Sequence, residues 1–140
     1  MRSYPDTSGY KGEFARGALA PRLRAVGVTY LFMGNDLGGR PRDARCYVGG
    51  AVDYDALSRT PAYRRGVVRL VDASRQARVV ALMCAEGDPA PCHRSRLIGE
   101  SLTRLGVTVA HITPTGGLVT QQELRTRNDG GQQRLFEHAV

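Results

Sequence analysis

The sequence predicts an α/β fold of three layers, in which helices cover both faces of a mostly parallel sheet. Three apolar segments of strand length, residues 28–34, 78–84 and 107–113, are separated by segments with helical spacing of apolar residues. Strand 78–84, helix 94–105 and strand 107–112 form one βαβ unit, which favours a right-handed crossover and parallel pairing.

The three predicted strands rest on composition. "VTYLFMG" (28–34) is rich in β-branched and aromatic residues and ends in glycine, which is typical of a buried strand. "RVVALMC" (78–84) is a continuous apolar run, as expected for a strand that is covered on both faces. "VTVAHIT" (107–113) supplies the third strand.

The predicted helices rest on apolar stripes and on their caps. Thr60 followed by Pro61 predicts an N-cap and first turn for a helix that runs to residue 74. Gly106 predicts the end of helix 94–105, and Thr120 with Glu123 predicts a capping box for a short helix. The expected buried face of the central helix is Tyr63, Val67, Leu70 and Val71, and that of the next helix is Leu97, Ile98, Leu102 and Leu105.

An earlier helix is predicted over residues 13–26, where Gly17 and Pro21 interrupt the pattern. Its apolar face is Phe14, Ala18, Leu19, Leu23 and Val26. At the other end, the polar stretch from about residue 126 onward predicts a mobile tail.

Length and composition predict a single cytosolic domain that spans residues 1–140. The chain is 41% hydrophobic and 24% charged, has no apolar run that would cross a bilayer, and lacks an apolar secretory leader. Its three cysteines are too few for a disulfide framework, which favours reduced thiols or a metal site. The net charge of +7 is typical either of a solvated basic surface or of a protein with a polyanionic partner such as nucleic acid or a nucleotide.

The candidate site lies where the three predicted strands end. Ligands of open α/β sheets bind beyond the carboxyl ends of the strands. Three unusual segments map to that edge: "GNDLGGR", with Asp36 and Arg40, "CAEGDPAPCHR" (84–94), and "HITPTGG", which starts with His111. We expect them to form one pocket.

Several chemistries are open at "CAEGDPAPCHR". At the start of a helix, Cys92 would have a lowered pKa, and Arg94 would hold a thiolate, phosphate or carboxylate. Cys92 would then be a nucleophile or redox thiol with Cys84 as its partner, whereas packing in the core is the plainer role for Cys84 and for Cys46. His93, His111 and Glu86 are candidate general acids or bases. Glu86, which lies in a loop beside glycine and proline, is equally suited to forming a turn.

A metal site is the alternative for the same stretch. Cys84, Cys92 and His93, with His111 as a fourth ligand, would suit zinc or iron. The spacing Cys-x7-Cys-His lacks the Cys-x2-Cys knuckle of typical zinc motifs, so the sequence alone leaves the cofactor open.

The stretch "LMCAEGDPAPCHRSRLIGESLTRLGVTVAHI" resembles the bacterial and archaeal family known as domain of unknown function 488. The likeness rests on Cys-Ala-Glu, a proline-containing loop, Cys-His-Arg, a helix, and a strand ending in Val-x-His-Ile. "DLGGR" and "RSYP" (2–5) match further family signatures, and Arg2 within the latter is a candidate ligand-binding residue. The resemblance implies a Rossmann-like arrangement and is silent on activity.

Members of that family begin with a strand carrying a Gly-His-Ser turn, a helix and a second strand, whereas this chain opens at "MRSYP". The resemblance therefore implies an N-terminally shortened fold. Three explanations for the missing segment are open: translation starts late, the start site is misassigned, or a partner subunit covers the exposed sheet. A sheet edge left uncovered favours a homodimer or an unstable monomer.

The tail segment "QQRLF" (132–136) resembles the short motif by which bacterial replication and repair proteins dock on the sliding clamp. Leu135 and Phe136 would fill an apolar pocket while Gln132 fixes the register, and the alternative is that they fold back on the core.

Three functional hypotheses follow. The first is a small cytosolic enzyme or anionic-ligand (nucleotide-like) binding domain that uses a Cys/His/Arg pocket. The second is a non-catalytic nucleic-acid-associated module that docks on the sliding clamp. The third is a metal-binding structural or sensor domain.

Overall fold

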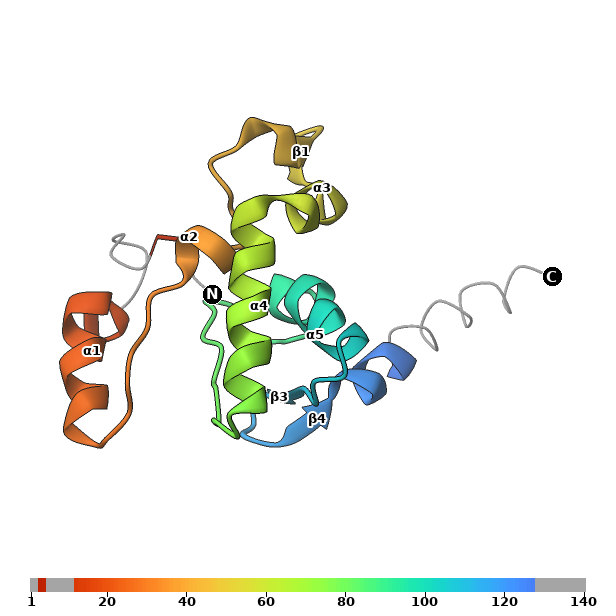
Figure 1. Ribbon diagram of the computed structural model, residues 1–140. Coiled ribbons are helices and arrows are strands. Elements are labelled where there is room, and N and C mark those ends of the chain that lie inside the picture. Colours follow the sequence, from red (N-terminus) through yellow and green to blue (C-terminus); the bar gives the residue numbers. More distant parts are fainter. Residues whose placement is uncertain (1–2, 5–11, 128–140) are drawn as a thin grey trace.

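Helix α4 (Pro61–Arg75) runs through the centre of the structure, and α2 (Gly34–Leu37), α3 (Tyr54–Arg59) and α5 (Glu100–Arg104) pack against it (Figure 1). The structure is a computed structural model that describes residues 3–4 and 12–127. The hydroxyl of Thr60 accepts the N–H of Tyr63 at 3.2 Å and Pro61 opens the first turn, so the predicted cap is confirmed. The predicted apolar face is also confirmed, because all four of its side chains are buried.

The predicted helix 94–105 is confirmed as a helical segment, but its first half is π-helical instead of α-helical. Element η3 (Arg94–Gly99) is π-helical and continues directly into α5 (Glu100–Arg104). Leu97, Ile98 and Leu102 join the side chains of α4 in the core, whereas the expected burial of Leu105 was wrong, because this residue follows the end of α5 and is 57% exposed. The hydroxyl of Tyr63 reaches the carbonyl of Leu97 at 3.1 Å and thereby fastens α4 to this segment. π-Helical turns are rare and frequently occur at functional sites.

Two small antiparallel sheets complete the regular structure. β1 (Tyr47–Val48) pairs with β2 (Ala51–Val52), and β3 (Ala110–Ile112) pairs with β4 (Leu118–Thr120). The chain is therefore a mixed helix and strand protein, but the described residues contain no parallel three-layer sheet.

Two of the predicted strands are extended segments without a ladder. Residues 28–33 and 78–84 are assigned no strand, and within the described residues no backbone–backbone hydrogen bond involves residues 79–84. Val79 is fully exposed and Leu31 is about half exposed, contrary to the burial expected of an inner strand. An apolar run adopts a strand only where a neighbouring chain segment satisfies its N–H and C=O groups.

The remaining helices are short except for α1 (Arg16–Ala25), which lies to the side of the core (Figure 1). Of its predicted apolar face only Leu19 is buried, so the expectation for the other side chains was wrong. The guanidinium of Arg16 lies 5.2 Å from the ring centroid of Phe32. The shorter elements are η1 (Gly12–Phe14), α2 (Gly34–Leu37), η2 (Ala44–Cys46) and α3 (Tyr54–Arg59).

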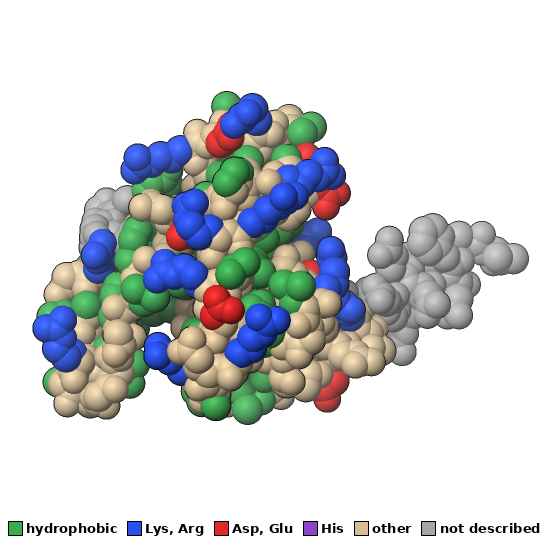
Figure 2. Space-filling model, viewed as in Figure 1, with side chains coloured by type: hydrophobic (Ala, Val, Ile, Leu, Met, Phe, Trp, Pro, Cys, Tyr) green, Lys and Arg blue, Asp and Glu red, His purple; other side chains and the backbone are tan. Residues whose placement is uncertain are grey.

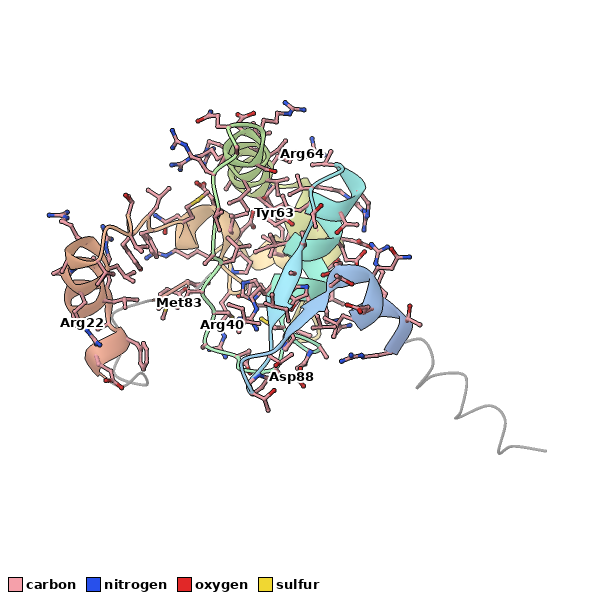
Figure 3. All side chains as sticks on the ribbon, turned by 90° about the horizontal axis from the view of Figure 1, so that it is seen from below. Arg22, Arg40, Tyr63, Arg64, Met83 and Asp88 are labelled. Carbon is pink, nitrogen blue, oxygen red and sulfur yellow. The ribbon has the colours of Figure 1, made fainter. Side chains whose placement is uncertain are left out.

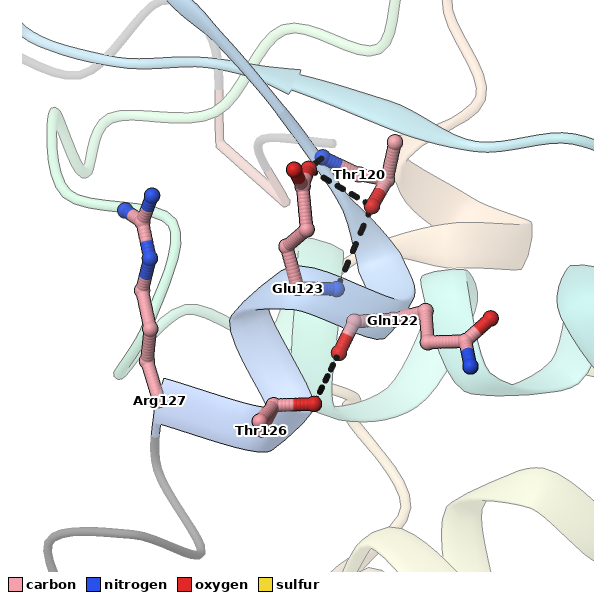
Figure 4. Close-up of a pocket in the computed structure, with 5 residues that line it drawn as sticks. All are labelled: Thr120, Gln122, Glu123, Thr126 and Arg127. Carbon is pink, nitrogen blue, oxygen red and sulfur yellow. Dashed lines mark hydrogen bonds between the residues drawn. The ribbon is translucent and has the colours of Figure 1, made fainter.

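Residues 121–127 form the last described helix, and its predicted capping box is confirmed (Figure 4). The carboxylate of Glu123 accepts the backbone N–H of Thr120 at 2.7 Å, while the Thr120 hydroxyl accepts the N–H of Glu123 at 3.2 Å. A hollow of about 670 Å³ beside this helix is lined by five residues, none of them cysteine or histidine.

On the face shown in Figure 2, arginine side chains are interspersed with apolar and acidic ones instead of forming a continuous basic band. No helix in the described part of the chain is long and apolar enough to span a membrane.

Candidate functional site

Cys84, Cys92 and His93 converge on one point of the structure, and we call them the soft-ligand cluster. The two sulfurs are 3.3 Å apart, and the Nδ1 atom of His93 lies 3.7 Å from each of them. Cys84 ends the extended segment 78–84, while the other two residues open the helical segment that includes η3.

The loop between the cysteines is folded by its own turn residues. The carboxylate of Asp88 accepts the N–H of Ala90 at 2.9 Å, and the carbonyl of Pro89 accepts the N–H of Cys92 at 3.2 Å. The carbonyl of Cys92 then accepts the N–H groups of Ser95 and Arg96, so helical bonding begins at the second cysteine. This loop brings two residues eight positions apart into contact.

Gly39 supplies the surface on which the imidazole of His93 rests. A Cβ atom at this glycine would lie 2.7 Å from Nδ1 and 2.8 Å from Cγ of the ring. The neighbouring backbone is held by Ser3, whose hydroxyl accepts the N–H of Arg40 at 3.0 Å. The sequence suggested that Gly-Gly lets the backbone approach a ligand; in the structure it approaches the histidine instead.

The cluster is largely withdrawn from solvent, and the two thiols differ in acidity. Cys92 is 1% exposed and His93 is 8% exposed. The S–H of Cys92 donates to the sulfur of Cys84, and with smaller help from His93 this lowers the pKa of Cys84 to about 3 despite burial. The same bond, together with burial, raises the pKa of Cys92. The sequence pointed to Cys92 as the thiol with the lowered pKa, whereas in the structure it is the pKa of Cys84 that is lowered.

Tyr54, which the sequence analysis did not single out, lies near the sulfurs of the soft-ligand cluster. Burial raises the pKa of Tyr54, and the charges of both sulfurs act on its phenol in the same direction. The guanidinium of Arg96 lies 6.0 Å from the centroid of its ring. Tyr54 follows Asp53, whose carboxylate caps α3 by accepting two backbone N–H groups, and this cap fixes the start of the helix.

Arg94 borders the soft-ligand cluster. Its backbone N–H donates to the sulfur of Cys92 at 3.4 Å, and its Nη2 donates to the carbonyl of Gly87 at 3.4 Å. Its Nε is buried and has no hydrogen-bond partner among the described residues.

His111 lies in a separate polar network. Its Nε2 is 2.6 Å from Oε1 of Gln121, and the amide nitrogen of Gln121 donates to Glu100 at 2.6 Å and to the carbonyl of Ser95 at 3.4 Å. Arg125 closes the network with a bond from Nε to Glu100 at 2.7 Å. The structure thus does not bring His111 into the group that includes the cysteines. No sequence motif marked Gln121.

The other predicted ligand-binding residues flank the cluster or lie away from it. Asp36 forms an ion pair with Arg65 at 2.7 Å, and together with Arg40 it lines a hollow of about 580 Å³ at the start of α4.

The side chain of Glu86 is exposed, while its backbone N–H donates a hydrogen bond to the sulfur of Cys84. The predicted residues Arg2, Gln132, Leu135 and Phe136 lie outside the described residues. The roles of all these residues stay predictions.

The three cluster residues offer two sulfur donors and one nitrogen donor within 4.8 Å of one another. Zinc–sulfur bonds of about 2.3 Å place two tetrahedral sulfur ligands about 3.8 Å apart, close to the separations in the cluster. No fourth cysteine, histidine or carboxylate in the described part of the chain joins the group. The donor set therefore fits a thiophilic cation with one coordination position left over.

Comparison with known proteins gives a family. The sequence model of the family described as "Domain of unknown function DUF488" matches residues 1–100, which include the whole soft-ligand cluster. No curated protein and no solved structure matches the chain significantly. The chain belongs to the DUF488 family.

Proposed function

We propose that this protein is a small cytosolic enzyme or ligand-binding domain whose pocket is a zinc centre formed by Cys84, Cys92 and His93. The observation that carries the proposal is the convergence of these three donors, with separations of 3.3 to 3.7 Å, two of them buried and Cys84 half-buried. Two sulfurs and an imidazole favour zinc over hard cations such as magnesium or calcium.

The number of ligands favours a functional site over a purely structural one. Structural zinc sites are closed by four protein ligands, whereas sites with three protein ligands leave a position for water or substrate. Zinc in such a position polarises a bound oxygen or lowers the pKa of bound water. Within this chain, Gly39 fixes the ring of His93, and the N–H of Arg94 donates to the sulfur of Cys92.

The test is the metal content of the full chain, purified without added metal. We expect about one zinc per chain in the parent protein, and Cys84→Ser should lose most of it because removal of one of three ligands weakens a zinc site strongly. Cys46→Ser is the matched control, since Cys46 is also buried but belongs to no candidate metal group in the described residues. A folded parent protein that contains no metal and takes up none from added zinc would contradict the proposal.

A second candidate function rests on the distance of 3.3 Å between the two sulfurs. Two thiols this close need little movement to form a disulfide, so the metal-free cluster would act as a dithiol redox pair. Hydrogen peroxide would then oxidise the pair to a disulfide, with two protons and two electrons passing to peroxide to give water. Intact mass measurement would show a loss of two hydrogen atoms that Cys84→Ser abolishes and Cys46→Ser retains.

A further inference from the structure

Arg94 is the one charged side chain in the described residues that has a buried donor atom without a hydrogen-bond partner. Its Nε is one of two buried side-chain nitrogen or oxygen atoms without a hydrogen-bond partner in the described residues. The other atom is the hydroxyl oxygen of Thr103, which is neutral. A buried donor without an acceptor is costly, and more so when it carries charge.

No carboxylate of the described residues forms an ion pair with this guanidinium, although Glu86 and Asp88 belong to the same loop. Asp88 directs a carboxylate oxygen to the N–H of Ala90, and Glu86 is exposed. The one side-chain bond of Arg94 runs from Nη2 to the carbonyl of Gly87, and at 3.4 Å it is long.

We infer that Arg94 binds an oxyanion group, phosphate or carboxylate, of a ligand that enters beside the soft-ligand cluster. A guanidinium presents parallel N–H donors that match two oxygens of such a group. The side chain is partly exposed, which gives a ligand access, while its buried Nε supplies the unsatisfied donor. The backbone N–H of Arg94 donates to Cys92, so the anion site and the cluster share one residue. This inference goes beyond the zinc proposal and does not require a bound metal.

The experiment is calorimetric titration of the full chain with inorganic phosphate and, separately, with acetate, in the zinc-loaded and the zinc-free state. Arg94→Gln should weaken binding of the preferred anion by about tenfold or more in both states, since bonds to a charged group are lost. Arg64→Gln removes the same charge from an exposed position of α4 (Figure 3) and should leave binding within twofold or so. The arm that gives the tighter binding identifies the anion as phosphate or carboxylate.

Absence of binding by the parent protein in both arms would overturn the inference, and so would equal binding by Arg94→Gln. Zinc content, measured on the same samples, separates the two proposals. A metal-free protein that loses phosphate binding in Arg94→Gln refutes only the zinc centre, whereas a zinc protein with unchanged binding in this variant refutes only the anion site.

Discussion

The two polar regions beside the segment that contains η3 contrast in how far their hydrogen-bonding capacity is used. In the network of His111, Gln121, Glu100 and Arg125, donors meet acceptors at 2.6 to 2.7 Å. In the soft-ligand cluster, by contrast, the contacts are between two sulfurs and an imidazole nitrogen at 3.3 to 3.7 Å, ordinary lengths for sulfur, and the neighbouring Arg94 keeps a buried N–H that has no partner among the described residues.

We propose that this difference separates a structural region from a functional one. A satisfied buried network fixes the positions of the elements that it joins, here η3, α5, β3 and helix 121–127. Two thiols and an imidazole that converge beside a buried guanidinium N–H with no partner in the described residues form the kind of group that binds something outside the chain. The following substitutions test whether the two regions have these separate roles.

The largest loss of stability is expected from Gly99→Ala. Its new methyl group would collide with the Gln121 side chain and approach the carbonyl of Arg94. Displacing the amide breaks its bonds to His111 and Glu100, and the free energy of unfolding should fall by about 2 to 3 kcal/mol. Urea denaturation measures the change, with Gly17→Ala in α1 as the control because no atom lies near that position.

Zinc binding should survive Gly99→Ala at temperatures where the variant is folded. Loss of zinc from the folded variant would show that the satisfied network also supports the soft-ligand cluster, and the proposed separation of roles would fail.

Gly39→Ala should have the opposite effect, weakening zinc binding more than it lowers the free energy of unfolding. The added methyl group meets the ring of His93 at 2.7 Å from Nδ1, so the imidazole has to turn away from the two sulfurs. We expect zinc affinity to fall about tenfold to a hundredfold, as when the support of a metal ligand is lost. Competition with a chelator measures this affinity. Gly87→Ala is the control, since its new Cβ would meet only Pro114, at 3.9 Å.

The smallest effect is expected from Glu100→Gln, and it should depend on pH. Arg125 and the amide of Gln121 lower the pKa of Glu100 below its ordinary value. A carboxyl whose pKa is lower in the folded than in the unfolded protein stabilises the fold above the unfolded pKa of about 4.3, and this contribution disappears as pH falls through the folded value.

Because the pair is partly solvent-exposed, Glu100→Gln should cost about 1 kcal/mol at pH 7 and progressively less below about pH 4. Thermal denaturation of both proteins across this range measures the difference. An equal loss at every pH would show that packing, and not the charge of Glu100, holds the network together.

The sequence predicted the parts of the fold that local chemistry controls. The Thr60 cap, the buried stripe of α4, the helical segment after Cys92 and the Thr120 capping box all depend on residues a few positions apart. The parallel sheet was not found among the described residues, because strand pairing depends on partners distant in sequence, and segment 78–84 has none there.

In the candidate site, too, the local features were predictable from the sequence and the tertiary contacts were not. Proximity of Cys84, Cys92 and His93 was predictable, because a turn-rich loop joins a strand-like run to a helix start. The contact of Gly39 with His93, and the diversion of His111 to Gln121, depend on tertiary packing that no local pattern encodes. The contact between the two thiols likewise depends on how the loop folds, and with it the lowered pKa falls on Cys84 instead of Cys92.

The central claim is that the soft-ligand cluster is a metal centre with three protein ligands. X-ray absorption at the zinc edge of the purified full chain tests it most directly. The account predicts two sulfur neighbours at about 2.3 Å and two nitrogen or oxygen neighbours at about 2.0 Å, one of them exchangeable. A zinc shell without sulfur, or with four sulfurs, would contradict it.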